Sequence, residues 1–364
     1  MNLRIGKFGR QEAASAVLIA TFFGSCFGAD PRALFEHGNA SYLIQILASI
    51  QALLLFEAVV WALRLRGGLD LASLIGRSRV KAALTVPLAL ALVFAAMQPL
   101  ERFLITITRY VFVDSKQVTV CMYLLPCLLL LTALGAETLM RTSRILLPVL
   151  LISIVGALLL GVGQYRTYRI YPIPLKEPLR IFTASGNFQF STIPPLLALL
   201  CVGEGTQDRM AMRSAGRIGA IGGGLLAAGA YFALAQSFTY LRLRTMPTPF
   251  YDMLVAVRTV NPTLRVDRAI LFLWLTGGIL TAAFYLYAAC VLLCKAFGMR
   301  DIRPAAFCVS TITVTLMLVL FYDSETTDGL VRAVSRFGWI PLTVPFPFLL
   351  LKKKRRQRKC AASV

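Results

Sequence analysis

Two stretches of small, hydroxyl-bearing and aromatic residues interrupt apolar segments of the chain. The first is Gly24-Ser25-Cys26-Phe27-Gly28, and the second is Phe190-Ser191-Thr192, which Ile193-Pro194-Pro195 follows. Interruptions by Gly and Pro at matching places in two halves of a membrane protein indicate a substrate site. Interrupted backbone is tolerated at membrane depth only where it is buried in protein or lines a cavity. Both stretches are therefore predicted to face one binding cavity.

The chemistry of these stretches predicts a site for a small zwitterion such as an amino acid. Unwinding at Gly24–Gly28 would free peptide N–H groups at the positive end of a half-helix, which suits a carboxylate. The second interruption offers carbonyl and hydroxyl oxygens, which suit an ammonium group. The predicted ligand contacts are Gly24, Ser25, Cys26, Phe27, Gly28, Phe190, Ser191 and Thr192, with the rings of Phe27, Phe188 and Phe190 closing over the ligand. The alternative is that the glycines and prolines only kink packed helices.

Three further polar residues lie inside apolar segments, where an unsatisfied polar group is costly. Gln98 and Tyr285 are predicted walls of the binding site, and each has an alternative role as an interhelical hydrogen-bond partner. Glu57 is a candidate proton or ion site, because acidic residues inside a membrane are normally functional. The alternative for Glu57 is an ion pair with Arg64 or Arg66, a turn or two away.

Composition makes this chain an all-α polytopic membrane protein. Of its 364 residues 57% are hydrophobic, and the mean hydropathy is +0.72. Many apolar runs approach the roughly 20 residues needed to cross a bilayer. The predicted spans are ten transmembrane helices near 11–28, 41–63, 82–106, 119–136, 145–163, 187–203, 218–239, 269–294, 305–322 and 337–351. The first is a true span and not a signal peptide, because nine more follow it.

The ten spans predict a single transmembrane domain over 1–364, built as a 5+5 inverted repeat of the LeuT-like kind. The first five-helix repeat covers 11–163 and the second covers 187–351, so the interrupted spans 1 and 6 correspond. An odd number of spans per half starts the second half from the opposite side of the membrane. In span 7, Gly219-x-x-x-Gly223 predicts close helix packing.

The charge distribution argues for a membrane protein and against nucleic-acid binding. The net charge is +21, and most of the 38 Lys and Arg residues fall on one side if both termini are cytoplasmic. That bias follows the positive-inside rule. The basic cytoplasmic tail, 352–364, is expected to fix topology and contact anionic membrane lipids, with a partner-binding role as the alternative.

Catalytic and metal-binding signatures are missing from the sequence. The single histidine is His37, and the eight cysteines show no zinc or redox spacing. No phosphate-loop, nucleophile-elbow or zinc-protease motif is present. We therefore expect no enzyme activity, no metal site and no cofactor, which disfavours a polytopic membrane enzyme.

Several motifs, in order along nearly the whole chain, carry a family resemblance. They are the opening Ile5-Gly6-Lys7-Phe8-Gly9-Arg10-Gln11-Glu12, the connection Gly135-Ala136-Glu137-Thr138-Leu139-Met140-Arg141, and Arg265–Trp274 at the start of span 8. Together they resemble the B-subunit family of spore germinant receptors, which are spore germination permeases of the amino acid–polyamine–organocation superfamily. In this chain, the second interruption lacks the carboxylate that the family often carries there.

The resemblance implies both a fold and a role. The implied site lies between spans 1, 3, 6 and 8, in the inner membrane of the spore. The implied role is sensing a nutrient, with a larger A subunit and a lipoprotein C subunit as partners. The alternative is an ordinary amino-acid or polyamine permease. Span 5 favours the sensor, because Ile145–Val162 has no ionisable residue of the kind that couples some relatives to protons.

Overall fold

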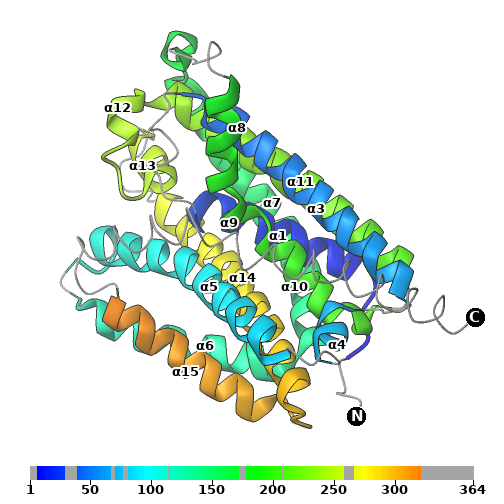
Figure 1. Cartoon of the computed structure of the whole chain (residues 1–364). Coiled ribbons are helices and arrows are strands. Elements are labelled where there is room, and N and C mark those ends of the chain that lie inside the picture. The colour runs from blue at the N-terminus through cyan, green and yellow to red at the C-terminus, as the bar shows by residue number, and fades with distance from the viewer. Residues whose placement is uncertain are drawn as a thin grey trace, which may run out of the picture.

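The computed structural model is helical throughout the part it describes, residues 6–28, 39–66, 70–76, 81–113, 115–171, 178–206, 208–257 and 266–320 (Figure 1). Its longer helices are α1 (Arg10–Gly28), α3 (Ser41–Arg66), α5 (Lys81–Tyr110), α6 (Gln117–Leu134), α7 (Ala136–Leu160), α11 (Arg209–Ser237), α14 (Val266–Phe297) and α15 (Arg303–Leu320). The shorter ones are α4 (Leu71–Gly76), α8 (Pro178–Asn187), α9 (Gln189–Thr192), α10 (Pro194–Val202), α12 (Tyr240–Leu243) and α13 (Pro249–Ala256).

Seven of the described helices, namely α3, α5, α6, α7, α11, α14 and α15, are long and apolar enough to cross a membrane. They correspond to predicted spans 2–5 and 7–9. Predicted spans 1 and 6 correspond to α1 and to the segment α8–α10, and predicted span 10 and the basic tail lie outside the described residues. Helices α7 and α11 each begin nine residues before the predicted boundaries at 145 and 218, because the amphipathic turns ahead of each apolar run are also helical.

Helix α1 lies in the centre of the structure and is not interrupted. It packs against α11, α14, α7 and α5, and all five residues of Gly24–Gly28 are buried helical residues. The predicted unwinding of this stretch is therefore wrong. A glycine inside a helix costs only about 1 kcal/mol relative to alanine, and the packing described below holds this turn in helical form.

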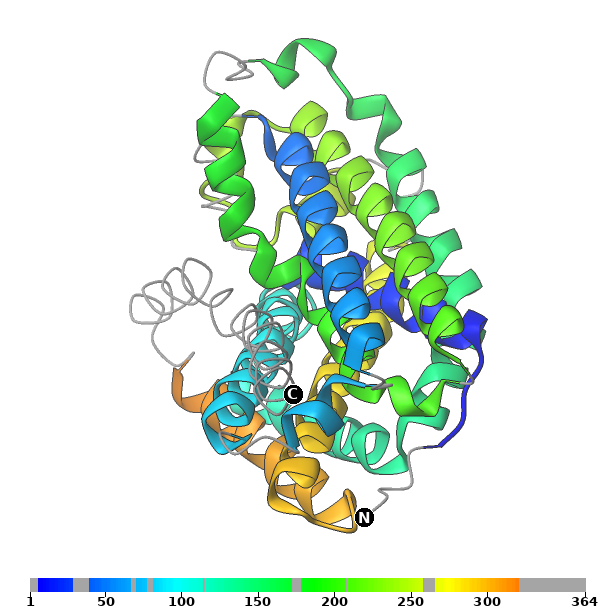
Figure 2. The ribbon, with the colours of Figure 1, turned by 45° about the vertical axis from the view of Figure 1, so that its right-hand side comes forward.

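Glycines of α11 bring it into direct contact with α1. A side chain at Gly219 would overlap Val17, and one at Gly223 would lie 2.7 Å from the carbonyl oxygen of Leu18. The predicted close packing at Gly219 and Gly223 is confirmed, and its partner is α1. Figure 2 shows α11 running beside α3, with α8 and α7 on either side of the pair.

The segment corresponding to predicted span 6 is divided into three helices. Helix α8 ends at Asn187, α9 is a single turn, and α10 starts with Pro194-Pro195. The backbone of Phe188 and Ile193 stays close to helical geometry. The division at Ile193 arises because Pro194 and Pro195 have no N–H group to donate to the carbonyls one turn back.

At one end of the bundle, charged residues join three separate elements. The ammonium Nζ of Lys295, near the end of α14, donates to Asp70 Oδ2 at 2.5 Å and to Glu204 Oε2 at 2.6 Å. Asp70, just before α4, is fully buried, and Glu204 follows α10. Nearby, Phe8 pairs with Thr206 in an isolated β-bridge, and its N–H donates to the carbonyl of Gly205. We call this group of contacts the Lys295 end.

At the other end of α14, the short helix α13 covers the bundle with aromatic side chains. The Phe250 ring lies 5.8 Å from the Phe27 ring and 5.3 Å from the Tyr231 ring. Tyr251 donates to Asp267 Oδ2 at 2.9 Å, and Asp252 accepts a hydrogen bond from Tyr110. We call these contacts the α13 end. The two ends are separated by the length of α14, whose 32 residues span about 48 Å at 1.5 Å per residue.

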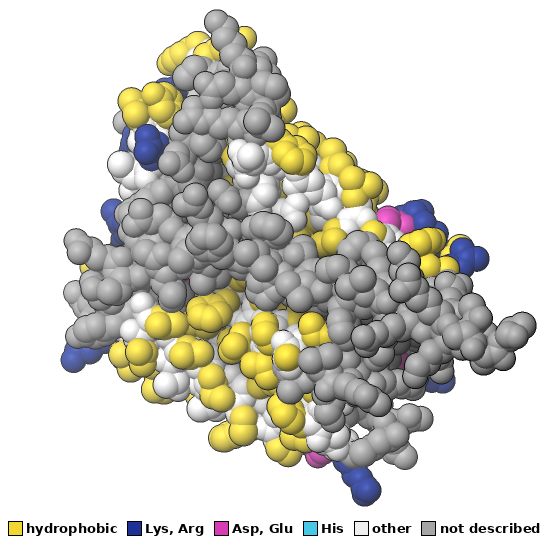
Figure 3. All heavy atoms as spheres, viewed as in Figure 1, with side chains coloured by type: hydrophobic (Ala, Val, Ile, Leu, Met, Phe, Trp, Pro, Cys, Tyr) yellow, Lys and Arg dark blue, Asp and Glu magenta, His cyan; other side chains and the backbone are white. Residues whose placement is uncertain are grey.

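The outer surface carries the apolar side chains expected of a membrane protein. Large hydrophobic residues such as Leu54, Ile145, Ile152 and Val319 are more than half exposed. Apolar side chains cover the part of the face in Figure 3 that α5, α6 and α15 form, and the Lys and Arg side chains lie at its margins. An exposed apolar belt of this kind is stable only in contact with lipid or other apolar partners.

Candidate functional site

The structure brings together three of the predicted site residues from three helices. A side-chain carbon at Gly24 of α1 would lie 2.9 Å from the hydroxyl of Tyr285 on α14 and 3.1 Å from the carbonyl oxygen of Ser191 on α9. The Tyr285 hydroxyl donates to the carbonyl of Ala20 at 3.2 Å. Gly24 therefore lets Tyr285 and Ser191 approach the α1 backbone, because a larger residue would occupy that space.

The carbonyl of Ser191 has lost its ordinary helical partner. In an uninterrupted helix the N–H group four residues later would donate to it, and here that residue is Pro195, which has no N–H. The Ser191 hydroxyl donates to the carbonyl of Phe188 at 2.8 Å, and the Thr192 hydroxyl contacts the same carbonyl at 3.4 Å. The second interruption therefore presents a hydrogen-bond acceptor toward Gly24.

Ser25 is held between α3 and α11. Gln45 of α3 donates from Nε2 to Ser25 Oγ at 3.1 Å and to Ser49 Oγ at 3.2 Å. Tyr231 of α11 donates from its hydroxyl to the Ser25 carbonyl at 2.6 Å. These buried contacts fix the last turn of α1 and keep it helical.

Phe27 lies in a cluster of aromatic rings from α5, α13 and α14. Its ring stacks on Phe103 at 4.5 Å and meets Trp274 edge-on at 5.6 Å, with Phe250 above at 5.8 Å. Offset and edge-to-face arrangements at these separations are the favourable ones. The predicted closing role of Phe27 therefore has a specific partner on α13, which the sequence did not indicate.

The remaining predicted residues occupy separate positions around the same turn of α1. Gln98 of α5 is buried and lies against Gly28, with its Oε1 3.6 Å from where a Gly28 side chain would begin. Cys26 and Phe190 are buried members of the hydrophobic core. Gln98 and Tyr285 both approach α1, and Tyr285 makes the interhelical hydrogen bond that was its alternative role.

Several buried polar atoms have no hydrogen-bond partner within the described ranges, and three of them belong to α1 or to residues that contact it. Thr21 Oγ1 lies one turn before Ser25, Gln45 Oε1 is an unused acceptor on a residue bonded to Ser25, and Trp274 Nε1 is an unused donor on a ring beside Phe27. Each costs about 1–3 kcal/mol while it stays unsatisfied. Gln45 could therefore accept a hydrogen bond from a ligand, and Trp274 could donate one.

Glu57 pairs with α11 and not with its own helix. Its Oε2 accepts from Arg213 Nε at 2.7 Å, and its Oε1 accepts from Arg217. The alternative pairing with Arg64 is wrong, because the carboxylate points at the neighbouring helix, where two arginines one turn apart meet it, and the side chain of Arg66 lies outside the described residues. This pair of ion bridges ties α3 to α11.

Sequence reasoning missed three polar residues inside the spans. Gln45 and Gln51 lie in an otherwise apolar stretch of α3, and Glu101 of α5 is only 4% exposed. The signal was present, because each is a polar residue in an apolar run, where burial requires a partner. The sequence prediction considered only Glu57 as a proton or ion candidate inside the spans, so it did not include these three residues.

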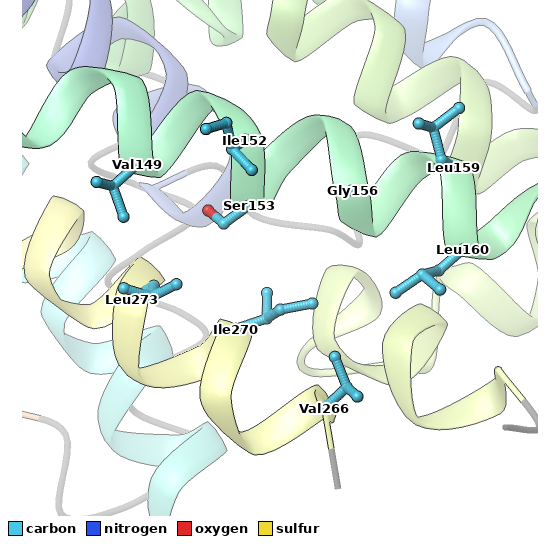
Figure 4. Close-up of a pocket in the computed structure, with 9 residues that line it drawn as sticks. All are labelled: Val149, Ile152, Ser153, Gly156, Leu159, Leu160, Val266, Ile270 and Leu273. Atoms are coloured by element: carbon cyan, nitrogen blue, oxygen red, sulfur yellow. The ribbon is translucent and has the colours of Figure 1, made fainter. Parts of the chain in front are cut away.

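An apolar groove lies away from this junction, on the outer face between α7 and α14 (Figure 4). It has a volume of about 590 Å³. Its lining is Val149, Ile152, Ser153, Gly156, Leu159, Leu160, Val266, Ile270 and Leu273. Ser153 supplies the one polar side chain of this lining, so the groove lacks the paired donors and acceptors that a zwitterion requires.

The fold is similar to that of solved membrane transporters. Similar solved structures are those of the Eremococcus coleocola manganese transporter, in one mutant form with TM-score 0.57 and 14% identity, and in complex with an aromatic bis-isothiourea substituted compound with TM-score 0.56 and 15% identity. Each match covers 94% of this chain and 78% of the other. This likeness concerns the fold. In the described ranges, no group of three or more His, Cys, Asp or Glu residues is placed to hold a metal ion.

Within that class, residues 18–328 match the family described as "Spore germination protein", and the chain belongs to this family of spore permeases. The family membership that the sequence suggested is thereby confirmed. Comparison with curated proteins found no match.

Proposed function

We propose that this protein is the nutrient-sensing subunit of a spore germinant receptor. It binds a small zwitterion, an amino acid, at the junction of α1, α9 and α14. Family membership and the transporter fold support a role in germination and a site in the membrane core. The proposal extends these findings to sensing as the activity and to an amino acid as the signal.

The observation that carries the proposal is the Ser191 carbonyl, freed by Pro195 and facing Gly24 beside the Tyr285 hydroxyl. A carbonyl acceptor of this kind suits an ammonium group, and Gln45 Oε1 adds a second unused acceptor nearby. Trp274 Nε1 offers the donor for the carboxylate, in place of the N–H groups of an unwound α1. Small shifts of Phe27 and Phe250 would open the space that the ligand fills.

Sensing is favoured over transport by the apolar middle of α7. Its residues from Ile145 to Leu160 include no ionisable side chain, so this helix offers no proton-coupling group at membrane depth. The alternative function is an amino-acid or polyamine permease, which uses the same site in a full transport cycle. The transporter fold is what favours this alternative.

The proposed setting is the inner membrane of the spore, with both termini in the cytoplasm and the A subunit and lipoprotein C subunit as partners. Ten spans in a 5+5 inverted repeat give this topology, with residues 11–163 and 187–351 as the two halves. The basic residues of 352–364 would then contact anionic lipids on the cytoplasmic side.

A deletion strain tests the receptor role. Spores that lack this gene should lose germination with at least one amino acid, and the response should return with the wild-type gene. An unchanged response to every amino acid, in a strain without related receptor genes, would overturn the proposal. Robust uptake of labelled amino acids by proteoliposomes holding this chain alone would favour the permease.

The position of the site is tested by a matched pair of glycine variants. Gly24→Val should abolish the response, because its side chain would occupy the space of the Tyr285 hydroxyl and the Ser191 carbonyl. Gly229→Ala is the control, since a side chain there meets open space. Normal responses from correctly folded Gly24→Val protein would place the ligand elsewhere.

A further inference from the structure

Helix α3 carries three long polar side chains, each bonded to a different neighbour. They are Gln45, Gln51 and Glu57, spaced six residues apart. Six residues turn a helix by about 600°, so successive side chains point about 120° apart. Gln45 reaches α1, Gln51 reaches α8 and α9, and Glu57 reaches α11. The spacing thus directs one polar group of α3 toward each of three surrounding elements.

Gln51 joins the two sides of the interruption at Phe188. Its Nε2 donates to Ser185 Oγ of α8 at 2.9 Å, and its Oε1 accepts from Gln189 Nε2 of α9 at 2.5 Å. Ser185 is fully buried and donates in turn to the carbonyl of Phe182 at 2.6 Å. Both ends of one amide are therefore used, one on each side of the break.

The backbone at this break joins the ends of two short helices. Phe188 N–H donates to the carbonyl of Ser185 at 3.2 Å, and Ser191 N–H donates to the carbonyl of Phe188 at 3.1 Å. Residues at the ends of helices are typical hinge positions. The side chain of Gln51, on α3, bonds to residues on both sides of this junction and so fixes the angle between α8 and α9.

We propose that Gln51 is a positioning residue for the ligand site. It sets where α9, and with it the Ser191 carbonyl, lies relative to α1. Gln45 of the same helix bonds to Ser25 of α1. Helix α3 therefore fixes the distance between α1 and α9, the two sides of the site. This inference rests on the proposed function for its ligand, but its structural part holds for any ligand of this junction.

Distance measurements test the structural part without a ligand. Spin labels on p-acetylphenylalanine replace Leu54 of α3 and Phe182 of α8, both more than half exposed, in the full chain in nanodiscs. The wild-type background should give one narrow distance distribution. Gln51→Met, close in size but unable to hydrogen-bond, should broaden it at least twofold. A distribution as narrow as wild type would overturn the proposal.

Two further variants keep the test decisive if Gln51→Met folds poorly. Gln189→Met and Ser185→Ala each remove one of the two bonds, and each should broaden the distribution by less than Gln51→Met. Val255→Ala, on an exposed position of α13, is the control and should leave it narrow. If all four variants gave the same distance distribution, the Gln51 amide would not hold α8 and α9 in position.

Binding of tritiated L-amino acids, tested one at a time, tests the functional part. For each amino acid that the wild type binds, Gln51→Met should raise the dissociation constant about tenfold. Gln51→Met combined with Gln189→Met should raise it no further, because both act through one contact. If the wild type binds none of them, the proposed function fails while the distance result still stands. Full additivity of the two variants would overturn the positioning role.

Discussion

The two ends of α14 are closed by opposite kinds of interaction. At the Lys295 end, one ammonium group lies between two carboxylates, and one of these, Asp70, is fully buried. At the α13 end, Phe250 and Tyr251 pack on other aromatic rings, and hydroxyl groups of tyrosines contact Asp252 and Asp267.

Because of this difference, the free energy needed to open the structure differs between the two ends. Separating a buried ion pair leaves charge without compensation in a medium of low dielectric constant. Lifting an aromatic helix exposes apolar area, at about 25 cal/mol per Å². The α13 end is a single short helix, so it can move alone. The Lys295 end joins three elements, which must move together.

The largest effect should come from Lys295→Met. Removing the ammonium group leaves the Asp70 and Glu204 carboxylates facing each other, and loss of one partner of a buried pair costs about 3–5 kcal/mol. Chemical unfolding in detergent measures the change. The double variant Lys295→Met/Asp70→Asn should recover much of the loss. A single variant as stable as wild type would show that the Lys295 end is not held by charge.

Phe250→Ala should have the next largest effect, at the α13 end. Truncating a buried Phe costs about 3–5 kcal/mol when the whole fold depends on it, and less here if α13 detaches alone. Hydrogen exchange should show faster exchange in 249–256 with little change in α14. The control is Val255→Ala, an exposed position of α13. Equal acceleration throughout α14 would show that α13 does not move independently.

Glu204→Gln should have a smaller effect than either. Glu204 is 36% exposed, and part-exposed ion pairs contribute about 0–1 kcal/mol and weaken in salt. The variant should unfold near the wild-type midpoint in detergent, and added salt should reduce the difference further. A loss as large as that of Lys295→Met would mean that the two carboxylates contribute equally, against their difference in burial.

The smallest expected effect is a pH dependence at the α13 end. Burial raises the pKa of Asp252, although Tyr110, Arg109, Thr248 and Arg242 act in the opposite direction. A carboxyl with a raised pKa binds its proton more tightly in the folded protein. Its contribution to stability is therefore full below the unfolded-state pKa, near 3.8, and is lost as pH rises through the folded-state pKa.

This dependence is measured as the melting temperature in detergent between about pH 4 and pH 7. The wild type should lose stability relative to Asp252→Asn as the pH rises through this range. Asp252→Asn has no titrating group at this position, so it is the reference for the wild type. An unchanged difference between the two proteins across the range would contradict the raised pKa.

Sequence patterns were sufficient for most of the membrane helices and for the close helix contact at Gly219 and Gly223, although not for its partner α1. Apolar runs of adequate length identify spans because lipid leaves the backbone few other options. The close approach at Gly219 and Gly223 was predictable, since small residues at this spacing commonly let two helices pack closely in a membrane. The acceptor at the second interruption was predictable as well, because proline removes a donor wherever it occurs.

The helical state of Gly24–Gly28 was not predictable from its own residues. Tyr231, Gln45 and Tyr285 stabilise this turn from three other helices, and the two tyrosines lie more than 200 residues further along the chain. The partners of Glu57 and Asp70 were hidden for the same reason. Arg213 and Lys295 lie about 160 and 225 residues from them, and nothing local in the sequence marks such a pairing.

The contact of α1 with α11 also has a consequence for how the protein is made. Helix α1 is synthesised well before its main partner, because the glycines of α11 that receive it, such as Gly223, follow nearly 200 residues later. At translation rates of about 5–20 residues per second, α1 waits roughly 10–40 s for its main partner. During that interval its small and hydroxyl-bearing face must be sheltered by the insertion machinery or by other early helices. The docking of α1 is therefore expected to follow the synthesis of α11.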